Sequence, residues 1–454
     1  MHRGNIHPAS FRDPSGFIFE REGKLLRQVN HVYKQHYDLF IQSGLYHKLV
    51  SGNFIIPHKE VQEEPFNNDG YIILEPQQLD TITYPSEWCF SQLKDAALAT
   101  LAITQMAIDH GMILKDATPY NIQFVGGHPL HIDTLSFETY DASKPWVAYR
   151  QFCNCFLFPL YMAHYSELEV HKIFAAFPEG ITAEITADLL PIKSRFNAGA
   201  LMHVHLQNSV TARPKNESRV SFTKSKLQAL LANLQSITSQ LVKKTRKSAW
   251  SAYYTSSILS DNYLSEKESV FTQLLDLVPP GLALDLGANN GNFSNILAAK
   301  SFKVIAVDND SNLVEELYGA VKSTGASVLP LVLDVTNATP SSGLGGIERQ
   351  SFHQRIQPTV VTALALIHHL AVGRNIPLNR LASYFSTFSP WLIIEWVPKE
   401  DPKVQEMLAG REDIFNSYTL SSFEQEFSLF FKVHGREKIH NTERWIYLMK
   451  RTDI

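Results

Sequence analysis

Two short apolar runs, each ending in an acidic residue and separated by a glycine-bearing loop, constrain the fold of this chain most strongly. Residues 283–286 (ALDL) lead into Gly287 and Gly291, and residues 304–307 (VIAV) end at Asp308, 21 residues after Gly287. A buried strand, a tight turn, a helix and a second strand that ends in a carboxylate form the opening of a nucleotide-type α/β sheet. Ligand-binding residues are therefore expected at the carboxyl ends of these strands.

The spacing of the glycines indicates which ligand such a loop holds. A dinucleotide site requires G-x-G-x-x-G, whereas here Ala288 and Asn289 follow Gly287 and the next glycine is Gly291. The loop also lacks a basic residue that could meet a phosphate. A ligand with a ribose and no pyrophosphate fits better. The alternative is an ordinary βα turn in some other α/β protein.

Residues 285–291 resemble the first motif of the class I SAM-dependent methyltransferases, D-x-G-x-x-x-G. The resemblance implies S-adenosyl-L-methionine (SAM) as the cofactor. Asp285 would hold the loop and the methionine amino group, Asp308 the ribose hydroxyls and Asp334 the adenine edge. The cofactor-binding residues implied in this way are Asp285, Gly287, Ala288, Asn289, Gly291, Asp308, Asn309, Asp334 and Val335.

Further apolar runs continue the alternation of strands and helices after Asp308. Strands are predicted at residues 327–333, 359–365, 391–394, 427–433 and 445–449. The alternation predicts a parallel sheet with helices on both faces, that is, a Rossmann-like doubly wound α/β fold. The methyltransferase resemblance implies that the last strand runs antiparallel to the others.

Length and composition limit the class of protein. A chain of 454 residues is expected to hold two or three domains. Its 41 Lys plus Arg against 45 Asp plus Glu do not suggest a nucleic-acid binder, which usually has a basic face. No Asn-Pro-Pro-Tyr or Asp-Pro-Pro-Tyr segment of nucleic-acid amino methyltransferases follows the fourth predicted strand. We expect the methyl acceptor to be a small molecule or glycan rather than a nucleic acid.

Targeting and metal signals are weak. The first residues contain no apolar stretch of signal-peptide type, and no apolar window reaches the roughly 18 residues that span a bilayer. Three cysteines, Cys89, Cys153 and Cys155, are too few for a disulfide framework or zinc site. We expect a soluble, cytoplasmic protein without a metal site. Oligomeric state cannot be read from these residues.

A helical stretch separates the two informative halves. Leucines and isoleucines at residues 227–241 recur with the i, i+3, i+4, i+7 spacing of an amphipathic helix. Basic residues at 243–247 suit its C-terminus, and a solvated helix end is a better interpretation of them than a binding patch. The predicted organisation is an N-terminal domain at 1–204, a helical connector at 205–262 and a methyltransferase domain at 263–454.

The N-terminal half has a signature of its own at residues 111–133. Asp116 and Asn121 are spaced as D-x-x-x-x-N, and residues 122–132, with a turn at 126–129, predict a β-hairpin that ends at Asp133. This segment resembles the catalytic segment of protein-kinase-like folds, in which the first Asp orients a hydroxyl and the Asn and second Asp hold metal ions. The resemblance implies an α+β kinase-like domain.

The kinase-like signature is degenerate. His and Arg are missing before Asp116, Phe and Gly are missing after Asp133, and residues 17–27 could form a hairpin without a glycine-rich loop. Arg27 or Lys24 is the candidate replacement for the missing strand lysine. Alternatively, Asp116, Asn121 and Asp133 are turn residues that satisfy nearby backbone groups. As a whole, the two halves resemble a bacterial family of fused methyltransferases, some of them linked by name to nodulation.

Catalytic candidates follow the fourth and fifth predicted strands of the C-terminal half. His368 and His369 come directly after the fourth strand, and Glu395 ends the fifth. A histidine with a pKa near 6.5 suits removal of a proton from a nucleophile. Because consecutive residues point in different directions, at most one of the two histidines is expected to face the methyl group. The alternative is that one histidine is buried and hydrogen-bonded.

A polar, glycine-rich stretch at residues 335–357 is predicted to be a loop over the substrate. Long loops without secondary structure are often lids or disordered. Arg349 or Arg355 would then meet an anionic group of the substrate.

These features point to two functions and count against a third. The first is a SAM-dependent methyltransferase acting on an O or N nucleophile. The second is a kinase-like or pseudokinase regulatory protein whose C-terminal domain senses SAM. The third, a nicotinamide oxidoreductase, is disfavoured by the glycine spacing.

Overall fold

The computed structural model describes residues 5–166, 168–207, 223–243 and 262–452. The chain divides into two compact units. Unit 1 is Met1–Lys244 with Pro340–Gln350, and unit 2 is Thr245–Thr339 with Ser351–Ile454. The division differs from the predicted one, because residues 340–350 belong to unit 1 although they lie within the predicted methyltransferase domain.

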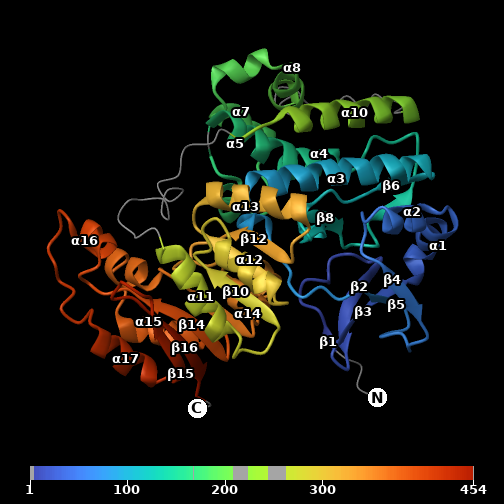
Figure 1. Ribbon diagram of the computed structural model, residues 1–454. Coiled ribbons are helices and arrows are strands. Elements are labelled where there is room, and N and C mark those ends of the chain that lie inside the picture. Colours follow the sequence, from blue (N-terminus) through green and yellow to red (C-terminus); the bar gives the residue numbers. More distant parts are fainter. Residues whose placement is uncertain (1–4, 167, 208–222, 244–261, 453–454) are drawn as a thin grey trace. The chain divides into compact units, whose positions relative to one another are not determined.

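Unit 1 begins with an antiparallel sheet (Figure 1). Among the described residues its strand order is β1-β2-β3-β5-β4. The predicted hairpin at residues 17–27 is confirmed, since β2 pairs with β3 and the turn residues Glu22 and Gly23 both have positive φ, as a two-residue hairpin turn requires. The strands are β1 (Asn5–Ile6), β2 (Gly16–Arg21), β3 (Lys24–Asn30), β4 (His58–Val61) and β5 (Gly70–Pro76).

A long apolar helix organises the rest of unit 1. Helix α3 (Phe90–Asp109) is followed by β6 (Met112–Leu114) and the hairpin of β7 (Ile122–Val125) and β8 (His128–His131). The hairpin confirms the prediction for residues 122–132, and Gly126 and Gly127 supply its positive-φ turn. Strand β9 (Phe137–Thr139) then pairs with β6, and helices α1 (Lys34–Gln42) and α2 (Leu45–Ser51) connect β3 with β4.

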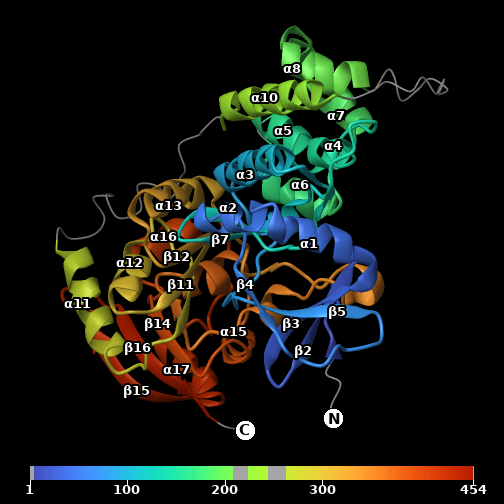
Figure 2. The same cartoon turned by 90° about the vertical axis from the view of Figure 1, so that its right-hand side faces the viewer.

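The helix expected to act as a connector is part of unit 1. Helix α10 (Lys224–Gln240) packs along α3, and both views show the two helices side by side (Figures 1 and 2). Leu227, Leu231 and Leu234 form its buried stripe, as the spacing predicted. Burial of this stripe against α3 is why the helix does not stand alone between two domains. The basic residues 244–247 lie outside the described residues.

In the described part of the chain, η1 (His31–Tyr33), η2 (Pro85–Glu87) and η3 (Pro119–Asn121) precede β9, and further helices of unit 1 follow it. They are α4 (Tyr149–Phe152), η4 (Cys153–Leu157), α5 (Phe158–Ser166), α6 (Val170–Ala176), α7 (Ala183–Leu189), η5 (Ile192–Phe196), α8 (Ala198–Ala200) and η6 (Leu201–Leu206). None of the helices in the described part of the chain combines the length and apolarity that a membrane span needs.

Unit 2 is built around a mixed sheet with the order β12-β11-β10-β13-β14-β16-β15 among the described residues. Strands β10 to β14 are parallel, and β16 is antiparallel to both β14 and β15, as the resemblance implied for the last strand. The strands are β10 (Leu282–Leu286), β11 (Lys303–Asp308), β12 (Val328–Val332), β13 (Val360–Ala363), β14 (Trp391–Trp396), β15 (Phe431–Lys438) and β16 (Trp445–Arg451).

One of the strand predictions was partly wrong. Residues 427–433 were predicted as a strand, but α17 (Leu420–Ser428) occupies the first two and β15 begins at Phe431. Helix α17 packs on α15 (Leu378–Ser386). The prediction failed because a short apolar run does not distinguish a helix from a strand.

Helices cover both faces of the unit 2 sheet. On one face, α11 (Tyr263–Leu275), α12 (Asn292–Ala299) and α13 (Ser311–Thr324) share a core with Ile446 and Leu448 of β16. Tyr447 points to the other face, because neighbouring strand residues alternate, and there its ring contacts Phe423 of α17. The sheet is therefore doubly wound, as predicted.

Candidate functional site

The loop between β10 and α12 lies at the carboxyl end of the parallel strands. Gly287, Asn289 and Gly291 all have positive φ, between 51° and 81°. The main-chain N–H groups of Gly287 and Ala288 both donate to the carbonyl of Val307 on β11. The loop is therefore folded back against the neighbouring strand.

The two glycines of the loop serve different purposes. A Cβ on Gly291 would lie 2.4 Å from Cδ1 of Leu317, so this glycine permits close packing of α12 on α13. A Cβ on Gly287 would meet a single side-chain atom, Cδ1 of Leu366, at 3.5 Å. A Cβ at Gly287 would therefore fit beside its neighbours without a close contact.

Asp308, at the end of β11, holds this loop through hydrogen bonds. Its carboxylate accepts hydrogen bonds from the main-chain N–H groups of Asn289 and Asp310, each at 2.9 Å. Burial raises the pKa of Asp308, and these two hydrogen bonds oppose that rise. Asn309, the next residue, is exposed. The structure thus places Asp308 beside Asn289 at one edge of the sheet.

Asp285 lies deeper than the other acids. It is 3% exposed, and its two oxygens accept the hydroxyls of Ser294 and Thr362, each at 2.6 Å. Burial raises its pKa, against the effect of these bonds. Asp285 therefore ties β10 to α12 and β13.

Asp334 and Val335 follow β12, the strand that pairs with β11 on the side away from β10. The Asp334 carboxylate accepts from the main-chain N–H of Thr336 at 2.9 Å and forms an ion pair with Arg374 at 3.2 Å. The carbonyl of Val335 accepts the hydroxyl of Tyr384. Because the main-chain N–H of Leu333 donates to the carbonyl of Asp308, the ends of β11 and β12 are joined.

His368 is buried next to the end of β13. It is fully buried, and neither of its ring nitrogens has a hydrogen-bond partner among the described residues. Burial holds its pKa well below the usual value, and the nearby charges of Arg444 and Lys267 act in the same direction. His369 is half-buried, and burial lowers its pKa to about 4. Both imidazoles are therefore neutral at pH 7.

Glu395, at the end of β14, has no free oxygen. Oε1 accepts from the hydroxyl of Tyr263 at 2.9 Å and from Arg444 at 3.3 Å. Oε2 forms an ion pair with Nζ of Lys267 at 2.7 Å and accepts from the main-chain N–H of Ala365 at 2.8 Å. Burial alone would raise the pKa of Glu395, but the two cations lower it below its usual value. This residue is suited to positioning its neighbours rather than to accepting a proton.

Sequence reasoning missed the partners of Glu395. Tyr263 and Lys267 lie one helical turn apart on α11, and Arg444 precedes β16. The Arg444 guanidinium is fully buried and also pairs with both oxygens of Asp401, at 2.7 and 2.9 Å. The i, i+4 spacing of Tyr263 and Lys267 was the only local signal. No pattern near Arg444 marks it as buried.

Part of the loop that was predicted to cover the substrate belongs to unit 1. Residues 340–350 belong to unit 1, where Arg349 pairs with Glu179 at 2.7 Å and its guanidinium lies 4.2 Å from the ring centre of Tyr120. Glu348 forms a two-bond ion pair with Arg12. The structure therefore gives the Arg349 charge a protein partner in place of the expected substrate anion. Arg355 ends helix α14 (Phe352–Arg355) in unit 2.

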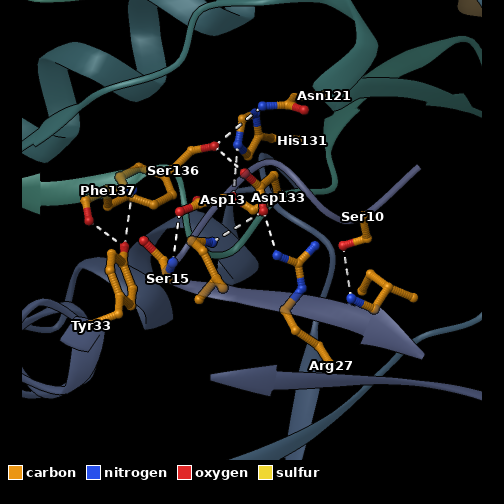
Figure 3. A network of polar contacts seen from close by, with 12 residues as sticks. Ser10, Asp13, Ser15, Arg27, Tyr33, Asn121, His131, Asp133, Ser136 and Phe137 are labelled. Atoms are coloured by element: carbon orange, nitrogen blue, oxygen red, sulfur yellow. Dashed lines mark hydrogen bonds and ion pairs between the residues drawn. The ribbon is translucent and has the colours of Figure 1, made fainter. Parts of the chain in front are cut away.

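Unit 1 brings the kinase-like residues into one polar network (Figure 3). Arg27 of β3 forms an ion pair with Asp133 at 2.5 Å, whereas Lys24 pairs with Glu75. The hydroxyl of Ser136 donates to Asp133 and accepts from the side-chain amide of Asn121. Of the two candidate replacements for the missing lysine, the geometry brings Arg27 to the acid.

The two acids of the kinase-like segment, Asp133 and Asp116, have opposite pKa shifts. Burial would raise the pKa of Asp133, but Arg27 and Ser136 lower it to about 2. Burial raises the pKa of Asp116 to about 6, and the charge of Asp133 adds to the effect. Lys115, next to Asp116, pairs with Asp13 at 3.0 Å. A kinase-like fold and activity for this unit stay a prediction.

Among the described residues, no group of three or more His, Cys, Asp or Glu side chains is arranged to hold a metal ion.

Comparisons with known proteins relate the whole chain to one relative. Nodulation protein NoeA of Rhizobium meliloti (strain 1021) is 33% identical over 457 residues, which span 98% of this chain and 96% of the relative. No protein-family model matches the chain.

Two solved methyltransferase structures are similar to part of the chain. N-methyltransferase NodS from Bradyrhizobium japonicum WM9 is 11% identical over 43% of this chain and 100% of its own, with a TM-score of 0.32. Magnesium protoporphyrin IX methyltransferase (ChlM) from Synechocystis PCC 6803, solved with bound SAH, is 16% identical over 42% of this chain and 83% of its own, with a TM-score of 0.31. Likenesses this weak carry no argument about activity.

Proposed function

The chain belongs to the family of nodulation protein NoeA, and on this premise we propose that its unit 2 is a SAM-dependent methyltransferase acting on an O or N nucleophile. The observation that carries the proposal is the loop at 287–291, which lies at the carboxyl end of the parallel strands and is tied by its main chain to Asp308. A ribose-bearing ligand without a pyrophosphate fits this loop, because it offers no basic side chain for a phosphate.

The residues that would hold SAM lie on three neighbouring strand ends. Each Asp308 oxygen accepts one main-chain hydrogen bond and keeps a second lone pair, so the carboxylate can still accept from ribose hydroxyls. Asp334 and Val335 would border the adenine. Asp285 is buried and its two oxygens accept hydroxyls from Ser294 and Thr362, so its contribution would be to hold the loop that faces the methionine part.

SAM would supply a methyl group activated by a positive sulfur. The protein then has to hold a nucleophile in line with that methyl group, and alignment of this kind lowers barriers by roughly 7–11 kcal/mol. Neither ring nitrogen of His368 has a hydrogen-bond partner in the part of the chain that the structure describes, and burial keeps the imidazole neutral at pH 7, so it could accept the proton of the attacking group or orient it. We assign the base or orienting role to His368, with His369 beside it.

Glu395 is a positioning residue in this proposal. Ala365, in the turn between β13 and His368, has a φ of 50°, which is uncommon for a residue with a Cβ. The hydrogen bond from its main-chain N–H to Glu395 holds the turn in that conformation. This turn fixes the direction of the His368 side chain.

Calorimetric titration with SAM and S-adenosylhomocysteine tests the proposal. Wild-type protein is expected to bind both, and Asp308→Ala is expected to lose most of the affinity because the ribose contact and the loop anchor disappear together. Asp276→Ala is the matched control, since Asp276 pairs with Lys300 on the surface of the same unit. Failure of the wild-type protein to bind SAM, or equal affinity in the two variants, would overturn the assignment.

A thermal-shift panel separates the alternatives. A ligand that binds the folded state raises the apparent melting temperature according to its concentration relative to its Kd. SAM and S-adenosylhomocysteine should stabilise the protein, and NAD should not. A shift with ATP and Mg²⁺ alone would favour the kinase-like alternative.

A further inference from the structure

An exposed apolar patch lies at one end of unit 1. Phe196 is 88% exposed and Ile192 is 77% exposed, both on η5. Elements α7, α8 and η6 all contact η5 or one another, and they lie beside α10 in both views (Figures 1 and 2). The patch, called here the η5 patch, consists of Leu189, Ile192, Phe196, Leu201, Met202 and Leu206, all of them exposed.

The η5 patch is held in place by polar contacts beneath it. Ser194, between the two most exposed residues, is fully buried, and its hydroxyl is 2.9 Å from Nε2 of His205 on η6. The side chain of Asn197 accepts a hydrogen bond from the main-chain N–H of Ala200 and so caps α8. The display of Ile192 and Phe196 is therefore fixed by the fold, and loss of these two side chains should leave the fold intact.

Two cations belong to the same segment as Ile192 and Phe196. Lys193 and Arg195 are exposed, and neither forms an ion pair with an acidic residue in the described part of the chain. The exposed acids nearby, Glu184 and Asp188, belong to α7. The segment that carries the two most exposed apolar side chains thus offers positive charge only.

We propose that the η5 patch docks on the surface of an anionic phospholipid bilayer. Ile192 and Phe196 would enter the boundary between headgroups and acyl chains, as apolar and aromatic residues do in interfacial segments. Lys193 and Arg195 would contact lipid phosphates while their stems lie along the apolar surface. A second copy of the chain is the less suitable occupant, because lysines are depleted from the centres of protein interfaces.

Vesicle co-sedimentation of the full-length protein tests the proposal. The protein is expected to sediment with vesicles that contain phosphatidylcholine and phosphatidylglycerol. With phosphatidylcholine alone the bound fraction should be much smaller, and added salt should weaken binding because the attraction is partly electrostatic. The Ile192→Ser/Phe196→Ser variant should lower the partition coefficient at least about tenfold.

Two further variants make the result specific. Lys193→Glu/Arg195→Glu should abolish the preference for phosphatidylglycerol while the apolar side chains remain. Val32→Ser is the matched control, since Val32 is 71% exposed in the same unit but lies outside the patch, and it should bind like the wild type. Melting curves check that each variant is folded.

The proposal is overturned if wild-type protein does not sediment with the anionic vesicles, or if the serine variant binds them equally well. It is also overturned if light scattering shows a dimer that Phe196→Ser dissociates, because a second copy would then cover the patch.

Discussion

Removal of the Lys267 ammonium should destabilise unit 2 strongly. Lys267 and Glu395 are both fully buried and 2.7 Å apart. Removing one partner of a buried pair costs about 3–5 kcal/mol, because the other charge stays buried without compensation. Arg444 and Tyr263 still contact the other oxygen of Glu395. The loss of stability in Lys267→Met should therefore be at the lower end of this range, about 3 kcal/mol.

Hydrogen exchange of the peptide that contains β14 measures this effect in unit 2 alone, because its protection reports the local opening free energy. The Lys267→Met/Glu395→Gln variant should recover part of the loss, which a double-mutant cycle separates from each single change. Lys300→Met is the control, since its ion pair with Asp276 is exposed and should contribute less than about 1 kcal/mol.

The pH dependence provides a second measurement of the same pair. The folded-state pKa of Glu395 is lowered from 4.5, so its stabilising contribution is complete above about pH 4.5 and is lost as the pH falls through the folded pKa. Lys267→Met should reduce this acid sensitivity. An opening free energy within about 0.5 kcal/mol of wild type in Lys267→Met would refute the reasoning, because surface substitutions have effects of that size.

Three other predictions concern single side chains. Because burial lowers the folded pKa of His368 below 6.5, the free energy of unfolding should decrease by up to about 1.4 kcal/mol for each pH unit below pH 6.5. His368→Gln should reduce this slope in acid titrations of stability. An unchanged slope would contradict the assignment of a neutral imidazole. Gly291→Ala should lower the melting temperature more than Gly287→Ala does. Both positions have positive φ, but only at position 291 would the new Cβ lie 2.4 Å from Leu317. The reverse order of melting temperatures would contradict the packing argument. Arg27→Met should raise the pKa of Asp133 from about 2 and cost stability at pH 7, seen in urea unfolding, whereas Lys24→Met, at an exposed pair, should match wild type.

The sequence by itself determined the elements whose signals are local. Alternating apolar runs and turn residues predicted the strands of the unit 2 sheet apart from the start of β15, the hairpin of β7 and β8 and the buried stripe of α10, because each depends on neighbours along the chain. It also placed Asp308 and Glu395 at strand ends, where the parallel order brings them to one edge of the sheet.

Only the tertiary structure decided which charges meet. Glu395 and Tyr263 are 132 positions apart, Arg27 and Asp133 are 106 apart, and no local periodicity links either pair. Likewise, residues 340–350 joined unit 1 through Glu348 and Arg349, whose partners lie more than 150 positions earlier. Ion pairs of this kind depend on which segments the folded chain brings together, and that is set by packing of the whole chain.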